Sequence, residues 1–187
     1  MIKAGAIDKG MFLLFKDEPY QVTDREFVNP GKGSAFVRLK LKNVRTGLVN
    51  RPTMKSHDNV KDIPVEQREA QYLYREGESF MFMDSQTFDQ FGVARELVGS
   101  GKYYLKEGVA YQLLIWEGTP LQIQIPLKTT LSISQAETGE KGDSATGSTK
   151  NAVTDTGLTV KVPLFIKEGD RIVVKTDSGE YVERASG

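Results

Sequence analysis

The sequence predicts an all-β protein made of three small barrels in series. Short strand-like segments separated by turn residues follow one another along almost all of the 187 residues. The pattern restarts after Pro64 and again after Lys128, which gives three units, 1–64, 65–128 and 129–187. Units of roughly 60 residues with frequent turns are typical of SH3-like and OB-type barrels, in which a sheet closes on itself around a modest core.

The first unit contains the clearest strand. In "SAFVRLKLKNV", residues 34–44, small and apolar residues occupy alternate positions, and Phe36 shares the other positions with cations. A period of two places successive side chains on opposite faces of a strand, so one face is expected to be core and the other cationic. The segments "MFLLF" and "EPYQVTDREFV" before it are also strand-like, and "RTG", residues 45–47, is the next turn.

A hairpin tip with a single cation lies between two of these strands, in "NPGKGSAF". Pro30 fixes its own φ, and Gly31 and Gly33 permit a positive φ, so the chain is expected to turn tightly with Lys32 at the end. An ordinary soluble turn has the same composition. The cationic face that continues along the next strand, and the small residues of the turn, favour a tip that enters a confined site.

The second unit begins with "AQYLYREGESFMFM", which is typical of a hairpin turning at Glu76-Gly77. Its aromatic residues stand at alternate positions, so they are interpreted as core rather than as a surface for stacking bases. These residues are Tyr72, Tyr74, Phe80 and Phe82.

A helix is predicted over 84–99, "DSQTFDQFGVARELVG", with Ser85 as N-cap and with Phe88, Phe91, Leu97 and Val98 near helical spacing.

Strands follow in "GVAYQLLIWEG" and "PLQIQIPL". The third unit returns to short strands, which are interrupted by some 20 residues rich in Gly, Ser, Thr, Asp and Lys. A loop of that length is more often functional or disordered than incidental.

Composition excludes several classes of site. There is no cysteine and His57 is the only histidine, so disulfide scaffolds, thiolate nucleophiles and cysteine zinc sites are absent. No apolar run approaches a membrane span, so a cytoplasmic protein without membrane contact is expected.

Basic and acidic residues balance at 25 each, but residues 25–55 hold eight basic residues against one acid. That local positive charge suits a phosphate backbone.

Two stretches resemble enzyme motifs, but the residues that each motif requires beside them are missing. "GSGK", residues 99–102, lacks the first glycine of a phosphate-binding loop and is followed by a tyrosine rather than Ser or Thr. "GDSA", residues 142–145, resembles a serine-hydrolase block, but His57 in a surface loop is the only histidine that could act as its base. We therefore expect no enzyme, no metal and no cofactor.

Several linked segments resemble the bacterial elongation factor P family. "EFVNPGKGSAFVRLKLKN" is similar to its N-terminal hairpin, and "YLYREGESFMFMDSQTFDQ" to its central part. "KNAVTDTGLTVKVPLFIKEG", residues 150–169, is similar to its C-terminal signature, and "SGEYVER" to its ending. The resemblance covers essentially the whole chain in the right order.

The resemblance implies an SH3-like, KOW-type domain followed by two OB folds, in an L-shaped outline like that of tRNA. It implies a monomeric factor that binds both ribosomal subunits beside P-site peptidyl-tRNA and relieves stalling at consecutive prolines. Lys32 would point to the peptidyl-transferase centre and would be open to covalent modification by a lysine-modifying enzyme. The expected contacts to the tRNA backbone are Arg38, Lys40, Lys42 and Arg45.

A loop on the small-subunit side is implied as well. Its residues are Gly142, Asp143, Ser144, Ala145, Thr146 and Gly147. The family loop runs Gly-Asp-Thr-Ala-Gly-Thr-Gly, so the first two residues match and the later Gly and Thr exchange places. Lys32 excludes the branch with a rhamnosylated arginine, and leaves open β-lysylation, an aminopentanol-type extension or no modification. A general RNA-binding KOW/OB protein and an undetected enzyme are the alternatives.

Overall fold

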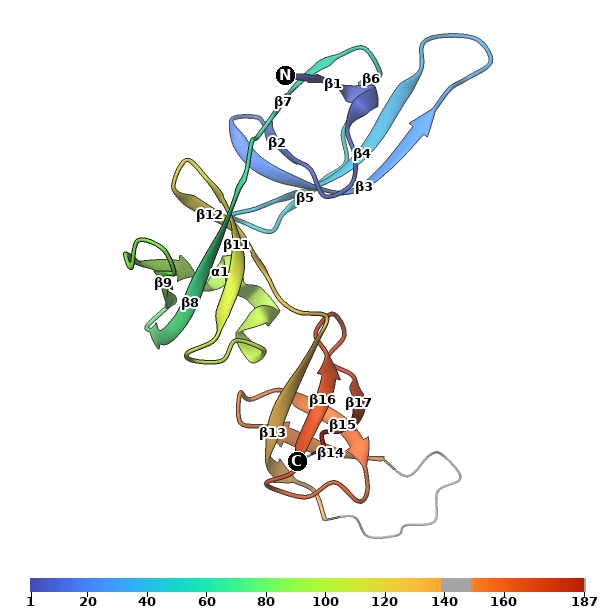
Figure 1. Cartoon of the computed structure of the whole chain (residues 1–187). Coiled ribbons are helices and arrows are strands. Elements are labelled where there is room, and N and C mark those ends of the chain that lie inside the picture. Colours follow the sequence, from blue (N-terminus) through green and yellow to red (C-terminus); the bar gives the residue numbers. More distant parts are fainter. Residues whose placement is uncertain (139–148, 187) are drawn as a thin grey trace. The chain divides into compact units, whose positions relative to one another are not determined.

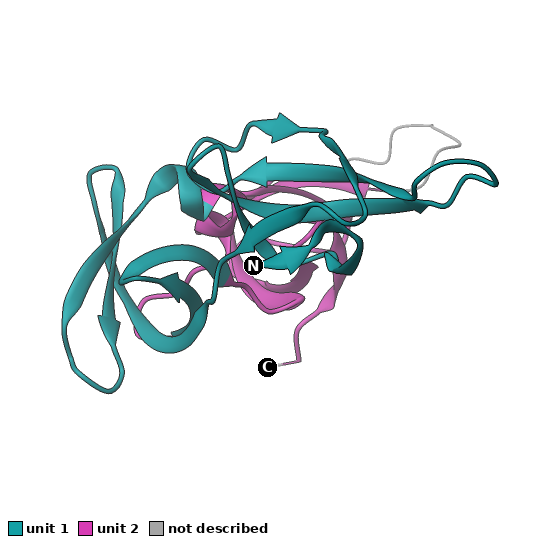
Figure 2. Cartoon of the chain, turned by 90° about the horizontal axis from the view of Figure 1, so that it is seen from above, with its two compact units in different colours: residues 1–98, 110–123 teal, residues 99–109, 124–187 magenta. Residues whose placement is uncertain are grey.

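The computed structural model describes residues 1–138 and 149–186, and these residues form three antiparallel sheets (Figure 1). The chain divides into two compact units (Figure 2). One contains residues 1–98 and 110–123, and the other contains residues 99–109 and 124–187. The all-β class expected from the alternating pattern is confirmed.

The first sheet has seven strands in the order β1-β7-β2-β3-β4-β5, and β6 also pairs with β4. A short 3₁₀ helix, Ala4–Ala6, follows β1. The strands are β1 Ile2–Lys3, β2 Phe12–Phe15, β3 Glu18–Val28, β4 Phe36–Asn43, β5 Val49–Asn50, β6 Thr53–Lys55 and β7 Asn59–Asp62. The sheet curls around a core that includes Ile7, Leu13, Val22, Leu39 and Leu41. A small barrel of this kind is what the 60-residue spacing predicted.

The second and third sheets have five strands each and share one topology. Numbered within each sheet, the strands lie in the order third, second, first, fourth, fifth. The second sheet contains β8 Glu66–Glu76, β9 Ser79–Asp84, β10 Gln90–Ala94, β11 Ala110–Trp116 and β12 Thr119–Gln124. The third contains β13 Lys128–Ala136, β14 Thr149–Thr154, β15 Thr159–Pro163, β16 Arg171–Lys175 and β17 Tyr181–Arg184. In the third sheet β15 also contacts β17, which brings its two edges together. Five strands that close in this way are the plan of an OB fold.

The first two sheets pack on each other within one compact unit. Phe12, Ile63, Leu114 and Leu121 are buried there together, with Leu14, Val44, Val65 and Trp116 packed around them. In addition, the Gln21 side-chain amide donates to Gln122 Oε1 at 3.2 Å. Burial of these apolar side chains stabilises the pair of barrels as one body.

The helix expected over 84–99 is wrong for most of its length. Residues 85–89 form the turn of a hairpin, β10 Gln90–Ala94 pairs with β9, and the α-helix α1 spans only Arg95–Val98. A carboxylate determines this turn. Asp84 Oδ1 accepts the N–H of Gln86 at 2.8 Å and that of Thr87 at 3.0 Å. These hydrogen bonds, from Thr87 first and then Gln86, lower the pKa of the Asp84 carboxyl below its ordinary value of 3.8.

Hydrogen bonds and packing then keep the segment out of a helix. The N–H of Ser85 donates to the Glu69 carbonyl, and no helix begins at Ser85, because α1 starts at Arg95. Phe88 has a φ of 62° and its side chain is 68% exposed, so it covers no core. Tertiary pairing with β9 overrode the apparent helical spacing.

The segment 99–109 packs with the third sheet rather than with the second. Its 3₁₀ helix, Gly99–Tyr103, contains the "GSGK" stretch, so that stretch is local structure. Tyr104 is buried in the core of the third sheet beside Leu131, Ile133 and Ile166. Burial, and next the charge of Asp177, raise the pKa of the Tyr104 hydroxyl. Tyr104 therefore holds the segment 99–109 in the core of the C-terminal barrel.

Candidate nucleic-acid interface

The tip that carries Lys32 joins the two long strands β3 and β4. Their register runs from Tyr20 opposite Asn43 to Val28 opposite Phe36, which leaves residues 29–35 as the loop. Gly33 has a φ of 107°, a conformation that L side chains rarely adopt. A Cβ placed on Gly31 or Gly33 would meet no atom within 4 Å, and Lys32 is exposed. Pro30 and the two glycines thus lie in the loop that joins β3 and β4, and Lys32 is exposed in this loop.

The base of this hairpin is braced on both sides. Strand β6 pairs with β4 from Phe36 opposite Lys55 to Arg38 opposite Thr53. The N–H of Ser56 donates to the Ala35 carbonyl at 2.9 Å, next to the tip. The 3₁₀ helix lies against the same place, because a Cβ on Gly5 would stand 3.2 Å from the Ser56 carbonyl oxygen and 3.6 Å from the Phe27 ring. Only the last few residues of the hairpin project beyond these contacts.

Strand β4 separates core from charge as its alternating pattern predicts. Val37, Leu39 and Leu41 are at most 2% exposed and belong to the first core. The side chains between them face outward: Arg38, Lys40 and Lys42 are exposed and Phe36 is half-buried. We call this side of β4, with the neighbouring edges of β3, β5 and β6, the outer face. Five cations of the described residues contribute to it: Arg38, Lys40, Lys42, Arg51 and Lys55, which stands opposite Phe36 in the register.

Two of the four predicted contact residues are engaged with carboxylates. Arg38 Nη1 lies 3.2 Å from Glu26 Oε2, its cross-strand partner, and Arg45 Nη1 lies 3.5 Å from Glu18 Oε2. Lys40 and Lys42 differ, because no carboxylate within the described ranges comes within 4 Å of either amine. These two lysines are thus available to an external anion without breaking an ion pair.

Arg51 joins the outer face although sequence reasoning did not select it. It lies between β5 and β6, which both pair with β4, and its side chain is exposed. Like the two lysines, it has no carboxylate within 4 Å in the part of the chain that is described. Its position in the basic run 25–55 was the only signal, since its neighbours Asn50 and Pro52 give no alternation to follow.

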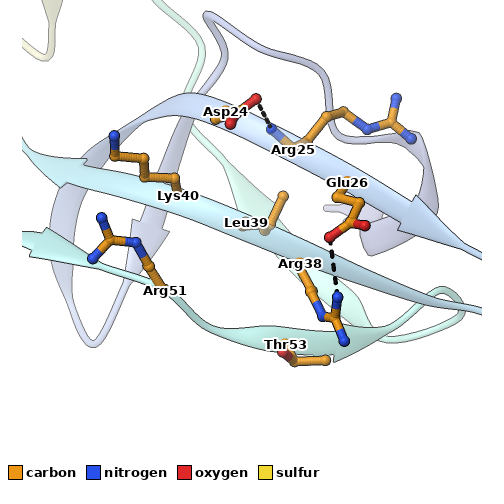
Figure 3. Close-up of a pocket in the computed structure, with 8 residues that line it drawn as sticks. All are labelled: Asp24, Arg25, Glu26, Arg38, Leu39, Lys40, Arg51 and Thr53. Carbon is orange, nitrogen blue, oxygen red and sulfur yellow. Dashed lines mark hydrogen bonds and ion pairs between the residues drawn. The ribbon is translucent and has the colours of Figure 1, made fainter.

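Arg25 is the opposite case, a cation of the basic run that does not serve this face. It stands opposite the buried Leu39, and Figure 3 shows its side chain directed away from Arg38 and Arg51. Its guanidinium donates to Asp8 Oδ1 at 2.7 Å and to the Gly5 carbonyl at 3.3 Å. A bulge at Thr23 shifts the register of β3 before this point. Arg25 therefore ties the start of the chain to the hairpin.

The outer face is hollowed between β3, β4 and β6 (Figure 3). The hollow has a volume of about 250 Å³, and Lys40 and Arg51 lie at one end, with the Glu26–Arg38 pair at the other. Asp24 lines it too, with one carboxylate oxygen accepting the N–H of Arg25 at 2.9 Å. A shallow polar hollow with cations at both ends fits successive phosphates of a nucleic-acid backbone better than it fits an apolar ligand.

Several other residues singled out in the sequence can also be placed within the described part of the chain. Tyr72, Phe80 and Phe82 are buried, as the core interpretation requires, whereas Tyr74 is 44% exposed. Within residues 1–138 and 149–186, His57 is an exposed loop residue, and no group of three His, Asp or Glu side chains could hold a metal ion. None of the helices in the described part is long and apolar enough to cross a membrane. The predicted loop 142–147 lies outside the described residues.

Comparison with known proteins agrees with these domains. The family descriptions "Elongation factor P (EF-P) KOW-like domain", "Elongation factor P (EF-P) OB domain" and "Elongation factor P, C-terminal" match residues 3–60, 65–123 and 129–184, respectively. Elongation factor P of Treponema denticola is 48% identical over 186 residues, which is 100% of both chains. That of Thermotoga petrophila is 42% identical over 185 residues, 99% of this chain and 100% of the relative.

The fold itself has a solved counterpart. A eukaryotic translation initiation factor 5A from Methanococcus jannaschii matches with a TM-score of 0.56 at 19% identity, over 66% of this chain and 91% of its own. At that identity the likeness concerns the fold alone. The full-length identities to the bacterial factors go further: the chain belongs to the elongation factor P family of translation elongation factors.

Proposed function

We propose that the protein binds the ribosome beside P-site peptidyl-tRNA and promotes peptide-bond formation at consecutive prolines. The observation that carries this proposal is the braced hairpin, which holds an exposed lysine, Lys32, in a loop whose two glycines have open space around them. Membership of the elongation factor P family supports a role in translation. The tip is directed to the peptidyl-transferase centre, and the outer face lies along the acceptor arm of the tRNA.

The chemistry is one of positioning. Lys32 supplies a cation and hydrogen-bond donors at a fixed place, and Gly31 and Gly33 keep the tip free of bulk. The factor adds no acid or base of its own, so the ribosome remains the catalyst. Holding a poorly reactive peptidyl-prolyl ester in attacking geometry lowers the entropic part of the barrier, an effect that can amount to several powers of ten in rate.

Lys32 is also the proposed acceptor of a covalent modification. An exposed lysine between two glycines gives a separate lysine-modifying enzyme access without unfolding the sheet. A longer side chain would extend the reach of the tip while the braced base of the hairpin stays in place. Beyond such a group, the protein works without a cofactor.

The remaining contacts follow from charge. Phosphates of the acceptor arm are held by Lys40, Lys42 and Arg51. Two more cations, Arg38 and Arg45, bind phosphate once it displaces their carboxylate partners. Duplex RNA is recognised in this way by shape and charge rather than by sequence. The third barrel approaches the small subunit through the loop 142–147. The protein acts in the cytoplasm as a monomer.

Reconstituted translation of a message that encodes three consecutive prolines tests the proposal. We expect the wild-type chain to raise the yield of full-length product, and Lys32→Ala to remove most of that gain. Lys61→Ala is the matched control, because Lys61 is an exposed lysine on β7 of the same sheet. Intact-mass measurement of each protein reports any adduct on Lys32.

Two results would decide against the proposal. Equal stalling with and without wild-type protein, whether modified or not, would remove the ribosomal role. If Lys32→Ala relieved stalling as well as wild type while loss of Lys40 and Arg51 weakened RNA binding, the protein would be a general RNA-binding factor without a role for the tip.

A further inference from the structure

We infer that Glu26 is a residue that limits the affinity for RNA, because it competes with RNA phosphate for Arg38 and so weakens binding to RNA in general. The inference rests on the proposed function, because it assigns a task to one acid on the face that meets the tRNA backbone. Glu26 and Arg38 stand directly opposite each other on β3 and β4. Their charged groups lie 3.2 Å apart, with side chains 61% and 58% exposed.

The pair is well suited to exchange. An ion pair this exposed is weak, since water and salt compete with it at little cost. A phosphate presents the guanidinium with the same kind of acceptor oxygens that the carboxylate does. An RNA strand that reaches Arg38 can therefore take the place of Glu26 without disturbing the backbone hydrogen bonds of the hairpin.

Arg38 remains in position when its partner leaves. Its guanidinium carbon lies 5.4 Å from the centre of the Phe36 ring, so a cation–π contact holds the group from the side nearer the tip. Thr53 of β6 stands opposite Arg38 in the register. The cation is thus held in place for a phosphate before any RNA arrives.

At the other end of the hollow, a phosphate can bind without displacing a carboxylate. Lys40 and Arg51 have no carboxylate within 4 Å among the described residues, and both line the same hollow as the Glu26–Arg38 pair (Figure 3). A backbone that follows β4 toward the tip meets these two cations first and Arg38 next. At Arg38 it must displace a carboxylate, which then lies beside the phosphate and repels it.

This arrangement separates the intended partner from other RNA. A short or misplaced RNA gains the two free cations and then meets the repulsion at Glu26. A ligand that also engages the tip and the other barrels compensates for that repulsion through additional contacts. The repulsion lowers the affinity for every RNA alike, so a complex with few other contacts does not persist, whereas a complex with many other contacts stays occupied.

The test measures binding of the full-length chain to two RNAs across a salt series. One is a duplex that ends in single-stranded CCA, and the other is an unrelated duplex of equal length. Glu26→Gln should tighten both complexes by about threefold or more at low salt and steepen the slope of log affinity against log salt by about 0.9. Asp17→Asn is the matched control, because Asp17 is exposed, has no ion pair among the described residues and has a φ of 63°, which asparagine tolerates.

A double-mutant cycle separates exchange at Arg38 from a general effect of charge. If Glu26 acts by occupying Arg38, the gain of Glu26→Gln disappears in an Arg38→Gln background. A gain that persists there, or an equal gain from Asp17→Asn, would overturn the inference. So would unchanged affinity of Glu26→Gln.

A competition assay links the inference to function. In the three-proline translation assay, excess unrelated duplex RNA should inhibit the Glu26→Gln protein at a several-fold lower concentration than it inhibits wild type. Equal inhibition would count against the inference alone. A wild-type chain that neither binds RNA nor relieves stalling would instead remove the proposed function, so the two failures are distinguishable.

Discussion

Replacing Arg51 by glutamine is the most direct test of the outer face. Arg51 was placed there by the pairing of β5 and β6 with β4, and not by any pattern in the sequence. The substitution removes one charge and keeps a polar side chain of similar length. Because Arg51 is exposed and makes no ion pair within the described residues, the sheet should fold unchanged.

The size of the effect follows from a count of free cations. On the described outer face four have no carboxylate within 4 Å, namely Lys40, Lys42, Arg51 and Lys55. With the value of about 0.9 for each phosphate neutralised on duplex DNA, the slope of log affinity against log salt is about −3.6 for wild type and about −2.7 for Arg51→Gln. From 50 to 200 mM salt, binding of a duplex RNA should then weaken about 150-fold for wild type and about 40-fold for the variant.

Fluorescence anisotropy of a labelled acceptor-arm duplex, titrated at four salt concentrations, measures these slopes. Lys61→Gln is the control, since it makes the same change of charge on β7, which two strands separate from β4. An unchanged slope for Arg51→Gln would refute the assignment of this arginine. An equal change for Lys61→Gln would show that only net charge matters and that the hollow is not the site.

Two further predictions concern the central barrel. Its unfolding can be followed by the fluorescence of Trp116, the single tryptophan, which lies at the end of β11. Phe82→Ala should lower the free energy of unfolding by about 3–5 kcal/mol, because Phe82 is 0% exposed and its removal leaves a cavity. Asp84→Asn should flatten the pH dependence of that free energy below about pH 4. The pKa of the Asp84 carboxyl is lowered in the folded state, so the wild-type chain has its full stability above the ordinary value of 3.8 and loses it as the pH falls through the folded value.

The Phe82 prediction has a control in the same hairpin, and the Asp84 prediction is checked against wild type. Phe88→Ala should change the free energy of unfolding by less than about 0.5 kcal/mol, because Phe88 is 68% exposed. A large loss for Phe88→Ala, or a small one for Phe82→Ala, would contradict the described packing. For Asp84, urea titrations at several pH values compare the variant with wild type, and an identical pH dependence would mean that its turn hydrogen bonds do not stabilise the fold.

Local patterns were enough for much of the fold and for the tip. The alternation along 34–44 gave both faces of β4 correctly, because the period of two is a property of the strand itself. The tip was predictable for the same reason, since the effects of Pro30 and Gly33 on φ are local. The helix expected over 84–99 failed where a local pattern had to compete with a strand partner.

The sequence by itself determined that Lys32 would stand on a narrow hairpin tip beside a cationic strand, since composition and period act within a few residues. Only the tertiary structure decided which cations remain free. Arg38 forms an ion pair with Glu26, and Arg25 forms one with Asp8. The pairing of β6 with β4 places Arg51 on the outer face. It also placed Tyr104 in the core of the third sheet. These outcomes depend on register and packing between segments far apart in the chain, and no local pattern encodes them.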